Sequence, residues 1–416
     1  MERIKIKNRK IDTLLILAMF ILVRICCPAL SNIPIFSMAF TFIYGVGFVF
    51  LYFLIVGKMN IRDFYLMVAA FLYAAYVFLR GVSTGNGLFA RDPFNAYVVV
   101  FLTMIYIWIK EKPTEIKMLF FRIILFALIF DYAYSIYVLI QDPDASRMAA
   151  VGGSGISPYD ILTAVGSFDA VYGGLSVVVI LLCVRQVLKK KHIKNITTLI
   201  VLLLAIAFII MASYATAILL LICSLALFFR QKSKAFSVLV LVAVILFIIF
   251  HKAIGQWLMD MSPNITYSEK ISEKMNDFGY MLKYFEASGT YAGEEGRTAK
   301  MIYSWETFLK YPFFGGIGMD DAKVYGHCEL LDFPGNFGLV GFAFLITYFV
   351  CLYKNIRLLL SSKEMRTCWK IILFVFAVSA ALNPSLYSLQ MMPLILMMPL
   401  APSYIEMCEN HNKSGE

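Results

Sequence analysis

Apolar runs long enough to cross a bilayer follow one another along most of this 416-residue chain. A helix needs about twenty apolar residues to cross the roughly 30 Å of hydrocarbon in a membrane. Hydrophobic residues make up 61% of the sequence and charged residues only 15%, which excludes a water-soluble domain of this length. The runs also lack the alternating pattern of a barrel strand. The sequence therefore predicts an all-α polytopic membrane protein, with one transmembrane domain over residues 1–416.

Twelve spans are predicted, so both termini are expected on the same side of the membrane. The pair around Ser213 is separated only by Ala212–Tyr214, and the last pair is divided near Gln390, so either pair could contain a re-entrant or half-length helix. The predicted spans lie near residues 11–30, 36–56, 64–80, 94–109, 118–140, 161–184, 196–212, 214–230, 236–252, 336–353, 371–389 and 390–405.

The basic residues orient this layout, because cytoplasmic connectors of membrane proteins hold an excess of Lys and Arg. The basic N-terminus and the connectors at 185–194, 230–234 and 354–370 all face one side, which we assign to the cytoplasm. We therefore expect a multi-pass protein of the cytoplasmic membrane with both termini cytoplasmic. The net charge of +10 follows from this topology, and we exclude nucleic acid as a partner.

The eight cysteines show neither metal-type nor redox-type spacing, so no disulfide framework, metal site or cofactor is predicted. No cleavable signal peptide is visible, and the first span is expected to act as the insertion signal.

Ionisable residues are rare deep within the predicted spans, where they are costly. Asp131 and Asp169 each lie about 13 to 15 Å along a helix from the same outer loop, and Arg24 lies in the first span. An ion pair between Arg24 and an aspartate would stabilise the bundle. A substrate contact or a proton relay is the alternative.

Two outer segments carry most of the remaining polar chemistry. The first, residues 141–160, combines Arg147 with Gly152, Gly153 and Gly155. Backbone N–H groups in such a loop could hold an anion beside the arginine, although an ordinary flexible connector fits equally well.

The second outer segment, residues 253–335, is the only long polar stretch of the chain, and its acidic residues outnumber its basic ones. Ile271, Met275, Phe278, Leu282 and Phe285 recur at helical spacing and predict an amphipathic helix on the membrane or the bundle. A second helix is predicted from Arg297 onward, with apolar residues including Trp305 on one face. Pro312 and the following Gly residues are expected to end it.

The order of motifs in this segment resembles that of the O-antigen and capsular polysaccharide polymerase and O-antigen ligase family. Arg297 opens a helix that contains Trp305; Pro312, a Gly-x-Gly and His327 follow; and a Gly-x-x-Gly at Gly338 and Gly341 heads a late span. The resemblance implies a GT-C-like membrane glycosyltransferase with about twelve transmembrane helices and one large extracytoplasmic loop.

The resemblance also implies roles for particular residues. Arg297 and Arg147 match arginines that contact the diphosphate of the donor, as bidentate guanidinium groups suit phosphate oxygens. His327 matches a histidine that accepts a proton from the acceptor sugar or binds that sugar; a surface histidine with a structural hydrogen bond is the alternative. Further expected substrate contacts are Glu329, Asp332 and Trp305. Gly338 and Gly341 are expected to permit close helix packing.

The expected function is polymerisation of lipid-linked repeat units of a capsule, exopolysaccharide or O-antigen. Cys328 stands where ligase-like members commonly have Asn, and Tyr214 stands where many members have Arg after Ser213. The missing Arg and the Leu331-Asp332 pair favour a polymerase over a ligase. A ligase of finished glycan and a lipid-linked glycan flippase remain alternatives. The implied partners are an undecaprenyl-diphosphate-linked oligosaccharide, the lipid bilayer, a chain-length regulator and a flippase.

Overall fold

The computed structural model describes residues 2–55, 59–83, 91–150, 165–190, 193, 195–230, 234–266, 269–284, 297–326, 328–360 and 362–414. Every regular element within these ranges is helical, and no strand occurs among them. The prediction of an all-α protein is confirmed for this part of the chain.

The helices follow the apolar runs closely. Those of the first half are α1 (Glu2–Cys26), α2 (Met38–Ile55), α3 (Ile61–Ser83), α4 (Arg91–Ile109), α5 (Thr114–Gln141), α6 (Ala145–Ala150), α7 (Phe168–Lys190) and α8 (Ile196–Met211). Those of the second half are α9 (Ala215–Arg230), α10 (Lys234–Met261), α11 (Glu269–Tyr284), α12 (Arg297–Lys310), α13 (Glu329–Leu359), α14 (Lys363–Leu382), α15 (Ser388–Met392) and α16 (Met398–Ser414). Short 3-10 helices occupy Pro28–Leu30, Pro34–Phe36 and Ser262–Asn264, and a π-helical segment, Pro393–Met397, joins α15 to α16.

Eight of the described helical segments are long and apolar enough to cross a membrane: α2, α3, α4, α5, α7, α13, α14 and the continuous stretch from α15 into α16. Shorter apolar helices cover Thr13–Cys26, Ile196–Met211 and Thr216–Arg230. Phe50, Leu79 and Phe126 remain more than 60% exposed on the outside of the bundle, as expected of side chains that face lipid. The chain is a multi-pass membrane protein.

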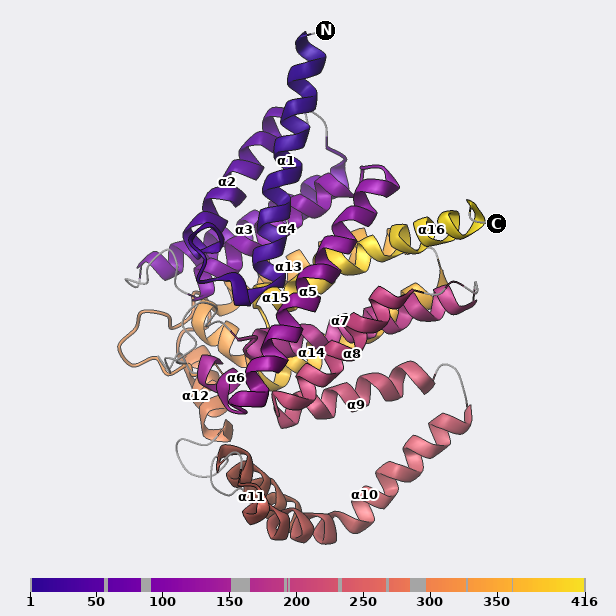
Figure 1. Cartoon of the computed structure of the whole chain (residues 1–416). Helices are drawn as coiled ribbons and strands as arrows, with labels where there is room; N and C mark the ends of the chain where they lie inside the picture. The colour runs from indigo at the N-terminus through magenta and orange to yellow at the C-terminus, as the bar shows by residue number, and fades with distance from the viewer. Residues whose placement is uncertain are drawn as a thin grey trace.

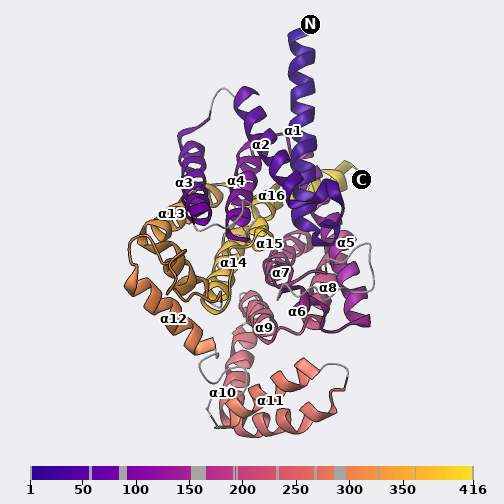
Figure 2. The same ribbon diagram turned by 90° about the vertical axis from the view of Figure 1, so that its left-hand side faces the viewer.

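The centre of the bundle is formed by α4 and α7 (Figures 1 and 2). Of the membrane-length part of each helix, 94% is buried in α4 and 78% in α7, against 22% in α2. The central helices are therefore surrounded by protein, whereas α2 lies at the edge.

The polar segment 253–335 contains both predicted helices, and they have different neighbours. α10 continues to Met261, beyond its predicted end at residue 252, and packs along α11. At their crossing the backbones nearly touch, because a Cβ added to Gly255 would lie 2.5 Å from the carbonyl oxygen of Gly279. Both views show the α10–α11 pair extending away from the rest of the bundle (Figures 1 and 2). α12 instead packs on α13.

The two uncertain divisions between spans have different outcomes. Ser213 separates α8 from α9 with a positive φ of 56°, so the predicted turn at Ala212–Tyr214 is confirmed. The predicted division at Gln390 is wrong, because Gln390 is buried inside α15. The chain breaks earlier, between Leu382 and Ser388, where Pro384 lacks the N–H that a continuing helix requires.

The intramembrane charges lie near one another without forming the predicted ion pair at contact distance. The Asp131 carboxylate is fully buried, and its Oδ1 accepts a hydrogen bond from the Ala29 N–H at 3.3 Å. Its Oδ2 and the Arg24 Nε have no hydrogen-bond partner. Asp169 instead accepts hydrogen bonds from the Ser167 hydroxyl at 2.7 Å and from the Ala170 N–H at 2.9 Å, so no ion pair joins Arg24 to either aspartate within the described residues.

Candidate functional site

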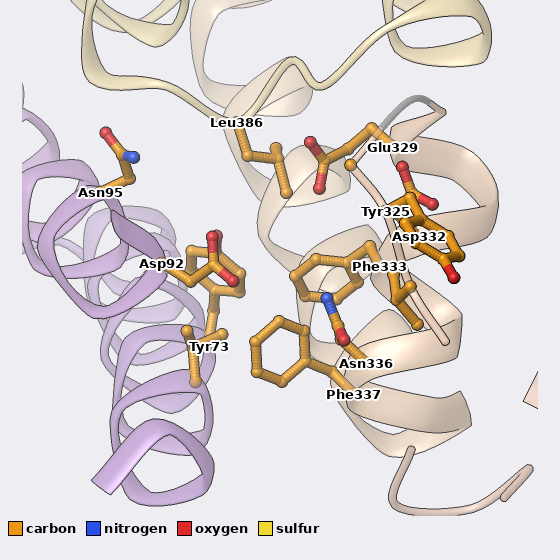
Figure 3. A pocket seen from close by; sticks show the side chains of 13 residues that line it. Tyr73, Asp92, Asn95, Tyr325, Glu329, Asp332, Phe333, Asn336, Phe337 and Leu386 are labelled. Atoms are coloured by element: carbon orange, nitrogen blue, oxygen red, sulfur yellow. The ribbon is translucent and has the colours of Figure 1, made fainter. Parts of the chain in front are cut away.

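A polar cavity of about 260 Å³ lies between α3, α4 and the start of α13 (Figure 3). Leu386, in the linker between α14 and α15, covers one side of the cavity. Tyr325 and Gly326, in the non-helical segment just before α13, form another side. The remaining lining residues are Tyr73, Val77, Asp92, Asn95, Val324, Glu329, Asp332, Phe333, Asn336 and Phe337. The cavity thus combines carboxylates and amides with aromatic walls.

Two polar side chains of the cavity also fix the linker between α14 and α15. Glu329, the first residue of α13, accepts a hydrogen bond from the Ser385 N–H at 2.9 Å. Asn95, near the start of α4, accepts a hydrogen bond from the Ser388 N–H at 2.9 Å. The linker is therefore held at both ends, which keeps Leu386 over the cavity.

Asp332 has a mainly structural set of contacts. Its side chain is 5% exposed, and it accepts hydrogen bonds from the Ser304 hydroxyl on α12 and from the Cys328 N–H, each at 2.6 Å. Hydrogen bonds from two donors stabilise a buried carboxylate. Asp332 therefore ties α12 and the preceding chain to the start of α13, and it contributes to the cavity wall from that fixed position.

α13 is interrupted beside the cavity. Gly338 adopts φ 64° and ψ −171°, so the helix consists of two parts. The turn after α12 fills the break: the Leu339 N–H donates to the Pro312 carbonyl, and the Gly316 N–H donates to the Gly335 carbonyl. A Cβ on Gly338 would lie 2.3 Å from the Phe313 carbonyl oxygen, so this glycine permits a close approach, but to the turn after α12 and not to another helix as expected.

Two side chains of α3 complete the hydrogen bonding at this break. The Tyr76 hydroxyl donates to the Phe337 carbonyl at 2.9 Å. Arg80 donates from Nη2 to the carbonyls of Gly315 and Ile317 at 3.2 and 3.3 Å. Carbonyl groups released by the turn and the helix break are thereby satisfied from α3.

The cavity lining carries carboxylates and no lysine or arginine among the described residues. Lys300 of α12 lies behind this wall, with its ammonium 5.7 Å from the centre of the Tyr325 ring. Burial raises the pKa of the Cys328 thiol at the start of α13, which keeps it protonated and unreactive near neutral pH. Such a lining suits an uncharged polyhydroxyl ligand better than a diphosphate.

The structure brings only some of the predicted site residues to the cavity. Glu329 and Asp332 line the cavity. His327 lies outside the described residues, although its neighbour Gly326 lines the cavity and Cys328 precedes the first turn of α13. Arg297 is the first residue of α12, as predicted, but its side chain lies outside the described part of the structure.

Trp305 does not line the cavity. Its ring is 46% exposed and packs beside Phe308, on a face of α12 that also presents Ile302 and Leu309. The opposite face of α12 turns Ser304 and Thr307 inward. Trp305 therefore lies on an apolar outer face of α12 and outside the polar cavity, and its contact with substrate stays a prediction.

The first outer loop lies beside a different part of the bundle. Arg147 is within α6, and its side chain lies outside the described residues, as do Gly152, Gly153 and Gly155. Ser146 anchors α6, donating from its hydroxyl to the Gly166 carbonyl and accepting at its own carbonyl from Tyr214. α6 and α12 overlap in Figure 1, but Figure 2 shows that they lie apart, so these two helices are not neighbours.

Sequence reasoning missed five polar residues of the cavity: Tyr73, Asp92, Asn95, Tyr325 and Asn336. Asp92 and Asn95 lie about one helical turn apart at the start of α4, so they share a face of the helix. This spacing can be recognised in the sequence. Figure 3 shows Asp92 on the α4 side of the cavity, facing Phe333 and Asn336 of α13.

Comparisons with protein-family models and with curated proteins found no match to this chain. Among the described residues, no group of three or more His, Cys, Asp or Glu side chains is arranged to hold a metal ion.

Proposed function

We propose that this protein is a membrane glycosyltransferase that polymerises lipid-linked polysaccharide repeat units. The observation that carries the proposal is the carboxylate-lined cavity at the start of α13. Carboxylates and amides hydrogen-bond sugar hydroxyls, and aromatic rings pack on the apolar faces of sugars. A volume of about 260 Å³, slightly below the usual range for drug-sized ligands, suits a single sugar ring.

In this proposal the cavity holds the terminal sugar of the acceptor. Glu329 is the candidate base, since a carboxylate at the cavity wall can take the proton of the attacking hydroxyl, and His327 is the adjacent alternative. The acceptor oxygen forms a bond to the anomeric carbon of the donor glycan. The bond from that carbon to the diphosphate oxygen breaks, and the diphosphate leaves on its undecaprenyl carrier, so the configuration inverts.

The donor diphosphate requires cations, which the cavity lining does not provide. We assign this role to Arg297 and Lys300 at the start of α12, because α6, which carries Arg147, lies apart from α12 (Figure 2). Lys300 stacks on Tyr325, a residue of the cavity wall, so a diphosphate bound there would lie next to the acceptor site. Fixed cations that meet developing negative charge are the main source of catalysis in reactions of this kind.

The proposed topology has twelve spans, with both termini in the cytoplasm. It places α12 and the first turn of α13 at the outer face of the cytoplasmic membrane. The basic connectors support this orientation. The chain-length regulator and flippase expected from the resemblance would act on the same lipid-linked substrate.

The decisive experiment supplies the purified protein in nanodiscs with lipid-linked repeat units and follows the product as a ladder of longer glycans. Asp92→Asn and Glu329→Gln should each lower the rate at least about tenfold, within the range typical of lost acid–base or substrate contacts. Asp321→Asn is the matched control, because Asp321 bonds Lys310 and Tyr311 on the exposed turn. A folded wild type that forms no ladder overturns the proposal.

The alternatives give different products in the same system. A ligase would transfer one finished glycan to a separate acceptor and form no ladder. A flippase would move a fluorescent lipid-linked glycan across the membrane without forming a new glycosidic bond.

A further inference from the structure

A second large cavity lies at the opposite end of the α3–α13 pair. It has a volume of about 790 Å³ and lies between the start of α3, the end of α13 and the start of α14. Its polar rim contains four basic residues, Arg62, Lys354, Arg357 and Arg366. We refer to this cavity as the basic groove.

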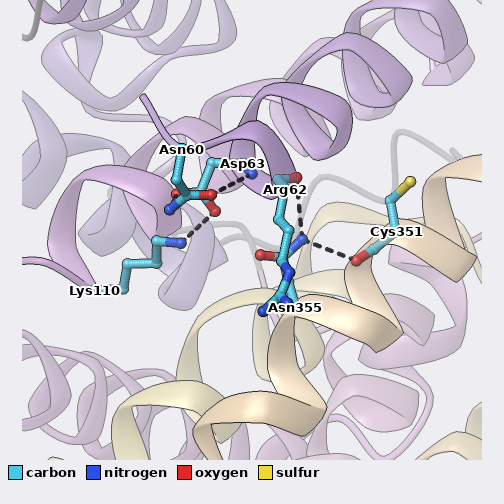
Figure 4. Close-up of polar contacts among 6 residues, drawn as sticks. All are labelled: Asn60, Arg62, Asp63, Lys110, Cys351 and Asn355. Carbon is cyan, nitrogen blue, oxygen red and sulfur yellow. Dashed lines mark hydrogen bonds and ion pairs between the residues drawn. The ribbon is translucent and has the colours of Figure 1, made fainter. Parts of the chain in front are cut away.

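Among the described residues, no acidic side chain lines the basic groove. The nearest carboxylate along the chain, Asp63, is fully buried and already paired, because it binds Lys110 and accepts a hydrogen bond from the Asn60 amide at 2.5 Å (Figure 4). Arg62, Lys354 and Arg357 are exposed and make no side-chain contact with an acid within the described residues. The positive charges of Arg62, Lys354 and Arg357 are therefore not neutralised by the part of the protein that the structure describes.

Below this rim the basic groove is apolar. Val68 and Leu72 continue along α3 from the end that bears Arg62, and Cys351 and Leu358 line the side formed by α13. Leu72 is 47% exposed and Leu358 is 60% exposed. Cations thus gather at the end of a slot whose walls fit a hydrocarbon chain.

The backbone beneath the groove is fixed. The Asn355 amide, 7% exposed, donates to the Arg62 carbonyl at 3.4 Å and to the Cys351 carbonyl at 3.1 Å (Figure 4). This contact holds the start of α3 against the end of α13, so the groove is a feature of the packed helices and does not depend on a flexible connector.

We infer that the basic groove binds an anionic phospholipid from the leaflet at this end of the bundle. The headgroup phosphate contacts Arg62, Lys354 and Arg357, and one acyl chain lies along Val68 and Leu72. Clustered Lys and Arg between transmembrane helices favour anionic lipid headgroups. A zwitterionic lipid has a compensating positive charge and gains less from this site.

The inference does not depend on the proposed glycosyl transfer, because its test measures lipid binding and no activity. Phosphatidylglycerol or phosphatidylcholine is titrated into the detergent-purified full chain, and bound lipids are counted by native mass spectrometry. The expected result is preferential retention of phosphatidylglycerol. The triple variant Arg62→Ala/Lys354→Ala/Arg357→Ala should weaken its binding at least about tenfold and leave phosphatidylcholine binding unchanged.

Two further variants make the test specific. Arg230→Ala/Lys363→Ala/Lys370→Ala removes the same charge from exposed positions outside the groove and should leave phosphatidylglycerol binding within twofold of the wild type. Arg62→Lys/Arg357→Lys retains the charge and should retain most of the binding. Equal loss in the two triple variants, equal binding of both lipids, or displacement of phosphatidylglycerol by inorganic phosphate would each overturn the inference.

Discussion

The Ser304 hydroxyl of α12 donates a hydrogen bond to the buried carboxylate of Asp332 in α13 at 2.6 Å. This bond joins the helix that begins at Arg297 to the helix that lines the polar cavity. The same carboxylate holds the Cys328 N–H, so one side chain orders the chain on both sides of the start of α13.

Asp332→Ala should therefore lower the thermal stability of the detergent-purified protein. A buried donor that loses its acceptor costs about 1–3 kcal/mol, and here two donors lose theirs. Ser304→Ala should have a smaller effect, and the double variant should cost less than the sum of the two single variants. Strict additivity in unfolding monitored by tryptophan fluorescence would show that the bond is not formed in the membrane protein.

Gly338→Ala should destabilise the protein strongly, because an added Cβ at φ 64° is strained and would lie 2.3 Å from the Phe313 carbonyl oxygen. Gly47→Ala is the matched control in another span, where the nearest atom to an added Cβ is a Leu17 methyl at 3.7 Å. The melting temperature of Gly47→Ala should match that of the wild type. Equal melting temperatures for both variants would mean that α13 is continuous.

Cys328 should resist alkylation at pH 7 in the folded protein. Thiol reagents attack the thiolate, and burial raises the pKa of this thiol, so the reactive fraction is small at neutral pH and increases only as pH rises. In a background without the other cysteines, N-ethylmaleimide should modify Cys328 only after denaturation in SDS. Met319→Cys, 45% exposed in the same segment, should react in the folded state; rapid labelling of Cys328 would contradict its burial.

Trp305 should lie in contact with lipid. Its face of α12 presents Ile302 and Leu309, and tryptophan favours the interface between hydrocarbon and headgroups. With Trp108, Trp257 and Trp369 replaced by Phe, brominated lipids should quench the fluorescence of Trp305. A tryptophan placed at Asp320 in the same background should be quenched mainly by aqueous acrylamide, and the same pattern at Trp305 would argue for a role at the glycan.

Apolar runs and helix-ending residues were sufficient to predict most of the long helices, because the spacing of Met301, Ile302 and Trp305 and the Pro312 turn are local properties of the sequence. The polar cavity depends instead on contacts between distant segments. Asn95 bonds Ser388, which is 293 positions away in the chain, and no local pattern in a single sequence reveals such a pair.

The break in α13 illustrates a second limit. Gly338 and Gly341 were expected to allow close packing, and Gly341 does approach Tyr76, with an added Cβ 2.8 Å from its ring. The left-handed backbone at Gly338 depends on the turn after α12 that bonds to it, which the glycine spacing does not specify. The division before Ser388 was also missed. Pro384 is a local sign of a helix break, but the apolar run continues on both sides of it, so the run alone did not show where the helix ends.

Because α13 consists of two parts, no continuous set of backbone hydrogen bonds fixes the angle between them. α3 contacts both parts: Tyr76 and Arg80 bond the region of the break, Tyr73 packs against Phe333 before it and Tyr348 after it, and the Arg62 carbonyl bonds Asn355 near the far end. α3 thus holds the two parts of α13 in a fixed arrangement. The geometry of the polar cavity is set by a helix that supplies only part of its lining, so substitutions on the α13-facing side of α3 should alter the cavity even where they lie on the opposite side of the membrane.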